Sequence, residues 1–330
     1  MLRRAYSFSM LFDAFLLRFT ASWLASAVRA GYWAAMLKRH SCYAATRRAL
    51  AICGALALSA GLTLAADLGT TALAQAAPAA SARGERSSIA LLSAGRLPDG
   101  SWRAGLSIAL DPGFKTYWRE PGDSGVPPVF DWSGSRNVAR VEVEWPAPRR
   151  FFDGAGWSIG YKDDVVLPLR IVAKDPGAPV VLDLRLDYAV CEKLCIPTGG
   201  HVVRELTESA EDAALLAPFV ARVPREVAPG EEAAGLRLET AGIDGQGDDV
   251  TVVALIAGEG LEDVFIEGES GWYFDRAELT RESDGRTRVR IPVAERPKDA
   301  AEKTSARLTI VGSAGAISVT ATLDAVPKAR

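Results

Sequence analysis

The chain has 330 residues, a formal net charge of −3 and charged side chains at 24% of its positions. Residues 1–76 hold eight of the 38 Lys and Arg residues but only two of the 41 Asp and Glu residues, so the remainder has a net charge near −9. Such an acidic remainder is a poor candidate for nucleic-acid binding. It also contains no Met and only His201, which excludes methionine-rich and histidine-rich metal sites.

The N-terminal segment has the order of features typical of a secretory signal. Arg47 and Arg48 precede an apolar run at 49–58, and small residues follow it up to Ala-Gln-Ala at 74–76. This run is shorter than the roughly 20 residues that a membrane-spanning helix needs. We therefore expect a cleaved signal over residues 1–76, a periplasmic mature protein, and no stable membrane anchor.

The signal begins unusually late in the chain. Met36 is followed by Leu37-Lys38-Arg39, which makes an ordinary signal start, so residues 1–35 are interpreted as a start-site artefact. A longer signal or a membrane-lying helix around Phe12 to Trp33 is the alternative.

Cysteine usage fits an exported protein. Cys42 and Cys53 are removed with the predicted signal, which leaves only Cys191 and Cys195, four positions apart. Two cysteines in an exported chain are expected to be paired or to cycle between thiol and disulfide.

Alternating apolar and polar residues dominate the chain after a predicted flexible leader at 77–85. The alternation at 104–110, 138–145, 165–173, 182–188 and 202–206 predicts about seven short antiparallel strands. Such a density of short strands is typical of a sandwich. We expect an all-β, immunoglobulin-like β-sandwich over residues 86–207.

A short helical linker is predicted at residues 208–232. Ser209 is placed to cap a helix that begins at Ala210, with Asp212 completing a capping box and Pro218 dividing the helix into two short turns. Alternation then resumes and predicts a second β-sandwich domain at 233–330, which we interpret as a structural or docking module.

Cys191 and Cys195 lie near the predicted tip of a hairpin, because strands flank them on both sides. A disulfide across so short a loop contributes only about 2 kcal/mol to stability in the chain-entropy model. Modest strain at an exposed tip raises the reduction potential of such a bond and makes it exchangeable. Both a redox-active pair and a structural disulfide therefore stay open at this point.

The motifs around this hairpin resemble a known family in their content and order. They are KTYWREPGDSGVPP at 115–128, FDW at 130–132, WPAP at 145–148, IGY at 159–161 and CEKLC at 191–195. Together they resemble the N-terminal periplasmic domain of thiol:disulfide interchange protein DsbD, especially the ScsB-like variants associated with suppression of copper sensitivity. The resemblance covers about residues 86–207, and the second β-domain is similar to the extended periplasmic portion of those variants.

The resemblance implies a protein-disulfide reductase-like module without a cofactor. It would receive electrons from a membrane thiol transporter of the DsbD or CcdA type and pass them to periplasmic thioredoxin-like proteins. Cys195 would exchange with partners and Cys191 would resolve the mixed disulfide. No polytopic membrane region or thioredoxin-like domain is recognisable in this sequence, so a separate membrane partner is implied.

The resemblance also names the surroundings of the pair. A cap loop at 151–161 would shield the sulfurs, with Phe151, Phe152, Trp157 and Tyr161 as its aromatic residues. Plugging the end of the sandwich is an equal alternative for Phe151, Phe152 and Trp157. Tyr117 and Trp118 would lie near the pair or belong to the core, and Arg119 and Asp123 complete the predicted surroundings of the pair.

Charge decides how readily a thiol ionises. Arg119 would lower the pKa of a nearby cysteine, whereas Asp123 or Glu192 would raise it. Which of these charges lies closest to the cysteines is left open by the sequence.

Two other functions stay open. The C-x3-C spacing followed by Pro197 and His201 is similar to that of copper chaperones, although those proteins place the motif at a helix start. A non-enzymatic adaptor with a structural disulfide is the third interpretation.

Overall fold

The computed structural model describes residues 80–152, 154, 156–246, 249–297 and 303–325. The predicted signal at 1–76 lies outside these residues. The described residues all belong to one compact unit of the chain, and their regular structure is β-strand except for helix α2 (Ala210–Val220). The all-β fold class is therefore confirmed. Over the same ranges, no helix is long and apolar enough to cross a membrane.

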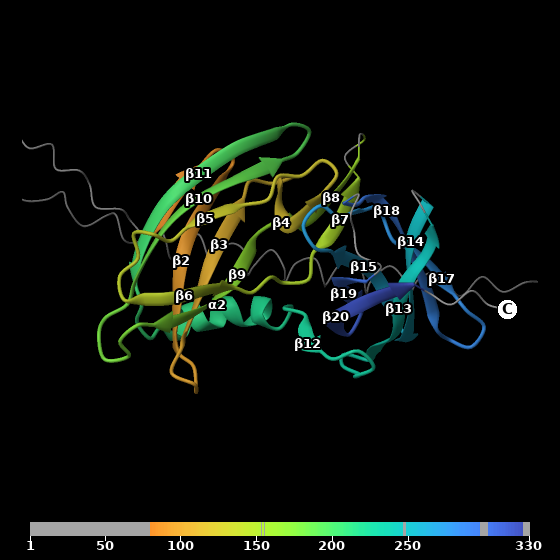
Figure 1. Ribbon diagram of the computed structural model, residues 1–330. Coiled ribbons are helices and arrows are strands. Elements are labelled where there is room, and N and C mark those ends of the chain that lie inside the picture. The colour runs from red at the N-terminus through yellow and green to blue at the C-terminus, as the bar shows by residue number, and fades with distance from the viewer. Residues whose placement is uncertain (1–79, 153, 155, 247–248, 298–302, 326–330) are drawn as a thin grey trace, which may run out of the picture. The chain divides into compact units, whose positions relative to one another are not determined.

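Two antiparallel sheets form the first sandwich (Figure 1). One sheet has the order β1 (Ser81–Gly84), β2 (Ser87–Arg96), β3 (Trp102–Leu110), β9 (Val165–Ala173) and β6 (Val138–Val143). The other has the order β11 (Cys195–Glu205), β10 (Val181–Cys191), β4 (Lys115–Gly122), β8 (Trp157–Lys162) and β7 (Arg149–Phe152), with β5 (Val129–Asp131) paired to β10. The predicted alternation thus corresponds to antiparallel pairing with one buried face.

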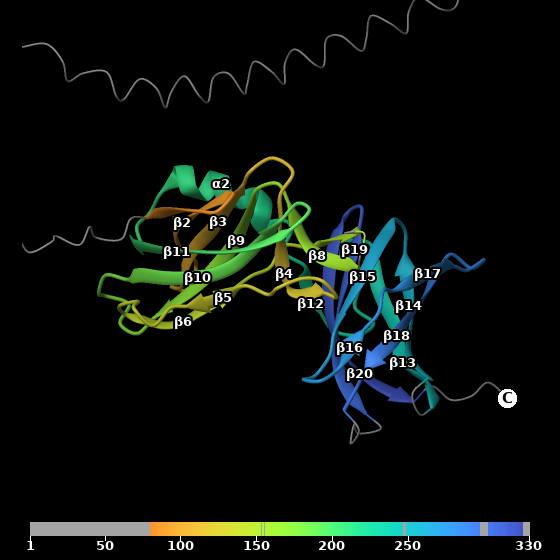
Figure 2. The ribbon, with the colours of Figure 1, turned by 90° about the horizontal axis from the view of Figure 1, so that it is seen from above.

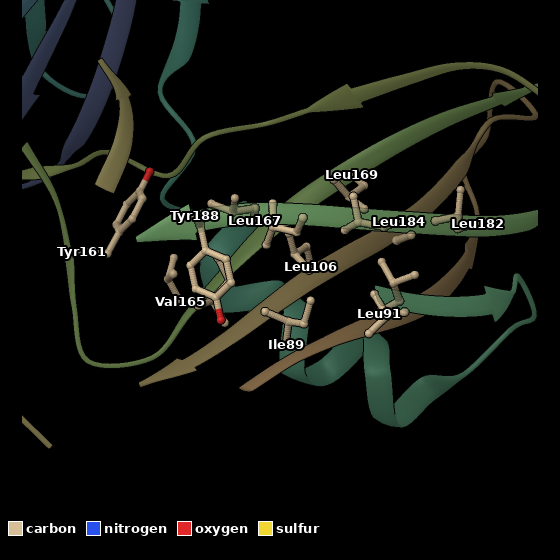
Figure 3. Packing of buried hydrophobic residues seen from close by; sticks show 14 of the residues in the cluster. Ile89, Leu91, Leu106, Tyr161, Val165, Leu167, Leu169, Leu182, Leu184 and Tyr188 are labelled. Atoms are coloured by element: carbon tan, nitrogen blue, oxygen red, sulfur yellow. The ribbon is translucent and has the colours of Figure 1, made fainter. Parts of the chain in front are cut away.

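The core of this sandwich lies between the two sheets. Leu182 and Leu184 of β10 point toward the side chains of β2 and β3, among them Leu91 and Leu106 (Figure 3). These four side chains are almost completely buried. Farther along β10, the Tyr188 hydroxyl lies 2.6 Å from Ser87 Oγ of β2. The core therefore fixes β10, the strand that ends at Cys191.

Strand β1 is a correction to the predicted flexible leader at 77–85. Residues 81–84 pair antiparallel with β2, and Ala82 packs against the core. The Glu85 backbone N–H also donates to Thr198 Oγ1 at 2.9 Å. The sequence did not indicate strand β1, because a strand that pairs with the edge of a sheet needs few apolar residues.

Helix α2 begins at the predicted cap, since Ser209 Oγ accepts from the Asp212 backbone N–H. Two details of the prediction are wrong. Pro218 does not divide the helix, because only two helical residues follow it. The Asp212 carboxylate does not return to Ser209; it accepts from the Ser93 backbone N–H at 2.9 Å and pairs with Arg204. Asp212 therefore anchors the helix to the sandwich.

The helix lies on the outer face of the five-stranded sheet. Leu216 packs with Leu92 of β2 and Val166 of β9, and Figure 2 shows α2 on the side of these strands away from β10. The predicted linker thus contains a helix that is packed on the first sandwich. The domain boundaries at 86–207 and 233–330 stay predictions.

The second β-region is one nine-stranded sheet with its own core. Its main path is β15 (Leu261–Glu267), β19 (Thr304–Gly312), β20 (Gly315–Ala325), β13 (Leu236–Gln246), β14 (Asp249–Gly258), β18 (Thr287–Glu295) and β16 (Tyr273–Phe274). Strand β12 (Arg225–Val227) pairs with β20, and β17 (Glu278–Arg281) pairs with β18. The strands of this path share one core, to which Leu308 of β19 and Val252 of β14 contribute.

Strands β10 and β11 form the hairpin that the sequence predicts. Their ladder runs without a register shift from Val181↔Glu205 to Cys191↔Cys195. Strand β11 is the edge of its sheet and contains Pro197. The hairpin therefore places both cysteines at its closed end.

Candidate functional site

The two cysteines are the last paired residues of the β10–β11 hairpin, and only residues 192–194 connect them. Their Sγ atoms lie 3.0 Å apart and both thiols are free. This separation is longer than the about 2.05 Å of a disulfide bond, so the structure shows a dithiol. Because the residues face each other across the ladder, only a small side-chain movement separates the dithiol from a bonded pair.

The two sulfurs differ in their access to solvent. Cys191 is only 4% exposed and packs with Tyr117 and Ala189. Cys195 is exposed, and the neighbouring Leu194 is 78% exposed. An approaching molecule therefore reaches Cys195 first.

Tyr117 of β4 contacts the exposed sulfur directly. Its Oη lies 2.8 Å from Cys195 Sγ, and its side chain is buried. Burial, followed by the hydrogen bonds and charges of the two cysteines, raises the pKa of Tyr117 far above its ordinary value. The hydroxyl thus stays protonated and is placed to donate to a Cys195 thiolate.

Lys115, the first residue of the motif at 115–128, is a second group beside the pair and was not among the predicted site residues. It is buried on β4, directly opposite Cys191 in the β4–β10 ladder. Its Nζ also lies 5.6 Å from the centre of the Phe151 ring on β7. Lys115 thus lies between the cysteine hairpin and the β7–β8 hairpin.

Burial is the main reason that the pKa of the Cys191 thiol is raised. The hydrogen bond with Cys195 and the Cys195 charge raise it further, whereas the Tyr117 hydroxyl and the Lys115 charge lower it. At neutral pH, the Cys191 thiol is therefore protonated.

We expect iodoacetamide at pH 7 to alkylate Cys195 at least about tenfold faster than Cys191, because a buried thiol is a poor nucleophile. The raised pKa of Cys191 means that its modification increases only above the ordinary cysteine value of about 8.5. Peptide mass mapping after short exposures measures both rates. The urea-unfolded chain serves as a control with similar rates, and equal rates in the folded protein would contradict the assignment.

The predicted cap loop at 151–161 contains the turn of the β7–β8 hairpin, with its ends in the two strands. Phe152 pairs with Trp157 in register, their ring centroids lie 5.2 Å apart, and Phe152 is 61% exposed. Cys195 is itself exposed. Among the aromatic residues of the cap loop, Phe151 reaches the site, because its ring lies beside Lys115 Nζ. Shielding of the sulfurs by Phe152 and Trp157 stays a prediction.

The other residues predicted to surround the pair have different positions and partners. Trp118 is 1% exposed in the core, and the Tyr161 hydroxyl donates to the Pro146 carbonyl oxygen at 2.7 Å. Arg119 forms an ion pair with Glu267 of β15. The Asp123 backbone N–H donates to the Trp157 carbonyl oxygen, next to the cap turn. Of the predicted residues, Tyr117 is therefore the one that contacts the pair.

His201 does not join the cysteines. Its Nε2 lies 2.6 Å from Asp183 Oδ1, and its ladder partner is Arg185. Cys191 lies six positions after Arg185 on β10, which is about 20 Å at the usual strand rise. Among the residues that the structure describes, no group of three or more His, Cys, Asp or Glu side chains is arranged to hold a metal ion.

Comparison with known proteins shows what the segment that contains this site is similar to. Residues 89–207 match the family model described as thiol:disulfide interchange protein DsbD, N-terminal. The matched segment spans most of the first sandwich and includes both cysteines. These residues are similar to a DsbD N-terminal domain. The predicted resemblance over about residues 86–207 is thus confirmed, and the chain contains a module of the thiol:disulfide interchange type.

A solved structure has the same fold over a longer part of the chain. The N-terminal periplasmic domain of ScsB from Proteus mirabilis is 21% identical and has a TM-score of 0.58; the match covers 74% of this chain and 99% of that one. Titin immunoglobulin tandem domains A164–A165 also match, at 10% identity over 74% of this chain and 97% of that one, but their TM-score is 0.15. Comparison with curated proteins finds no match. The ScsB likeness therefore extends the shared fold beyond the DsbD N-terminal domain.

Proposed function

We propose that this protein is a periplasmic thiol–disulfide exchange module that passes electrons from a membrane thiol transporter to thioredoxin-like proteins. The observation that carries the proposal is the dithiol at the hairpin end, in which Cys195 is exposed beside the Tyr117 hydroxyl and Cys191 is buried. The DsbD family match supports the chemistry. The periplasmic location of the ScsB relative supports the compartment.

The exchange proceeds in two steps. In the first step, the Cys195 thiolate attacks a partner disulfide; a Cys195–partner disulfide forms, and one partner sulfur leaves as a thiolate. In the second step, Cys191 loses its proton to solvent and attacks Cys195 Sγ; the Cys191–Cys195 bond forms, and the second partner sulfur leaves. The pair is oxidised by two electrons and the partner is reduced by two. A donor dithiol regenerates the pair by the reverse steps.

The groups around the pair support this order. While Cys195 carries a negative charge, that charge helps to keep the pKa of Cys191 high. Once Cys195 is bonded to the partner, its charge is gone, whereas Lys115 and Tyr117 continue to favour the Cys191 thiolate. The resolving sulfur is therefore activated after the first step.

Equilibration with glutathione tests the redox role. We expect the Cys191–Cys195 pair to have a reduction potential above about −300 mV, the value below which structural disulfides typically fall. Mass spectrometry after acid quenching and alkylation gives the fraction of bonded pair at each glutathione ratio. The Cys191→Ser variant controls for mixed disulfides with glutathione, and a potential below that limit would favour the structural disulfide.

A further inference from the structure

Strand β4 leaves its ladder directly after the residue that contacts Cys195. Tyr117 pairs with Gly160 of β8, and the next pair is Gly122 with Ser158. Residues 118–121 of β4 therefore lie opposite only Ile159, which makes a large bulge in β4. The four residues directly after Tyr117 therefore have no regular backbone pairing to β8.

Strand β15 of the nine-stranded sheet contacts this bulge through alternate residues. The Phe265 ring lies 5.8 Å from the Trp118 ring, centroid to centroid. Glu267 accepts two hydrogen bonds from Arg119, each of 2.7 Å, and the Arg119 guanidinium stacks 4.4 Å from the Trp118 ring. Both bulge residues are thus held by the second β-region.

These contacts are largely shielded from solvent. Phe265 is buried and belongs to the core of the first sandwich, although its strand belongs to the other sheet. The side chains of Arg119 and Glu267 are only 26% and 14% exposed. Two-pronged arginine–carboxylate contacts of this kind fix orientation as well as distance.

The same strand also reaches the β7–β8 hairpin. Asp263 accepts from the Arg150 guanidinium of β7 at 3.2 and 3.5 Å, and the Arg150 Nη2 donates to the Val264 carbonyl oxygen. Near β16, the Arg276 guanidinium lies 4.5 Å from the Trp157 ring of β8. Strand β15 therefore contacts both the β4 bulge and strand β7, the outer strand of the β7–β8 hairpin.

We propose that strand β15 is a positioning element of the thiol site, which holds the β4 bulge and thereby keeps the Tyr117 hydroxyl against Cys195. Arg119 and Glu267 are its positioning residues. The second β-region would then act on the reactivity of the pair as well as on stability, a role that rests on the proposed exchange at Cys195.

Charge exchange across the Arg119–Glu267 pair tests this inference on the full chain. The readout is the rate at which Cys195 reacts with an aromatic disulfide that releases a coloured thiolate. We expect Glu267→Arg to slow this reaction about three- to tenfold, and the double variant Arg119→Glu with Glu267→Arg to recover most of the loss, because coupled residues show non-additive effects. Glu267→Gln provides a milder variant if Glu267→Arg does not fold.

Glu282, directly after β17, and Arg288 of β18 provide a matched control in the second β-region. They form an ion pair with an N–O distance of 2.6 Å, and neither contacts the first sandwich in any described interaction. Glu282→Arg should leave the Cys195 rate unchanged. An unchanged rate in folded Glu267→Arg and Glu267→Gln would overturn the inference. If the exchange function itself is wrong, the reduction potential of the wild-type Cys191–Cys195 pair lies in the range of structural disulfides. The rates at which Cys195 reacts with the aromatic disulfide in the wild type and in the Glu267 variants can still be compared.

Discussion

Replacement of Cys191 by serine should convert the protein from a transient partner into one that accumulates a covalent adduct. The probe is a thioredoxin whose resolving cysteine is replaced by serine and whose remaining cysteine carries glutathione. Attack by Cys195 on the thioredoxin sulfur expels the glutathione thiolate and forms the adduct. Without the Cys191 thiol, the second step cannot occur, so we expect at least about tenfold more adduct than with the wild type.

The Cys195→Ser variant is the matched control for this experiment. Its remaining thiol, Cys191, is buried and has a raised pKa, so it should give little adduct. Non-reducing gels with and without a reductant measure both variants. Adducts from neither variant, or equal amounts from both, would contradict the assignment of Cys195 as the exchanging sulfur.

Removal of the Tyr117 hydroxyl should slow exchange at Cys195 by about tenfold or more at neutral pH. A hydrogen bond to a charged group contributes about 1.5–3 kcal/mol, and Tyr117→Phe removes the donor that lies 2.8 Å from Cys195 Sγ. The defect should become smaller as the pH rises, because the thiolate then forms without the donor. Stopped-flow measurement with oxidised glutathione over a range of pH values tests both expectations.

Tyr161→Phe is the control for loss of a buried tyrosine hydroxyl. Tyr161 is also buried, but its hydroxyl donates to the Pro146 carbonyl oxygen and contacts neither cysteine. This variant should lose only about 0.5–1.5 kcal/mol of stability and keep its rate of exchange. If both phenylalanine variants lose stability but exchange normally, Tyr117 has only a structural role.

The sequence predicted the first sandwich well where side chains alternate between core and solvent. Leu182 and Leu184 of β10 belong to such a pattern and are completely buried. Strand β1 was missed because its backbone pairs with β2 while its side chains stay largely accessible. The position of Pro218 was misread because a proline close to a helix end interrupts few hydrogen bonds.

Prediction of the site succeeded for local contacts and failed for distant ones. The hairpin and its two cysteines follow from neighbouring residues, and the family resemblance included Tyr117. Lys115 was missed because its place depends on the register between β4 and β10, which are far apart in the sequence. Arg119 faces Glu267, a partner 148 residues away, and no local pattern indicates that contact.

The edge position of β11 bears on how this protein avoids aggregation. The edge of a sheet keeps the Cys195 thiol accessible to partners. A free edge, however, can also pair with strands of other chains. Pro197 has no N–H to offer to such a strand, and the Glu85 contact with Thr198 occupies the neighbouring stretch. Two copies of the chain are therefore more readily joined by an intermolecular disulfide than by pairing of their β11 edges. A reductant should convert any such dimer to monomers.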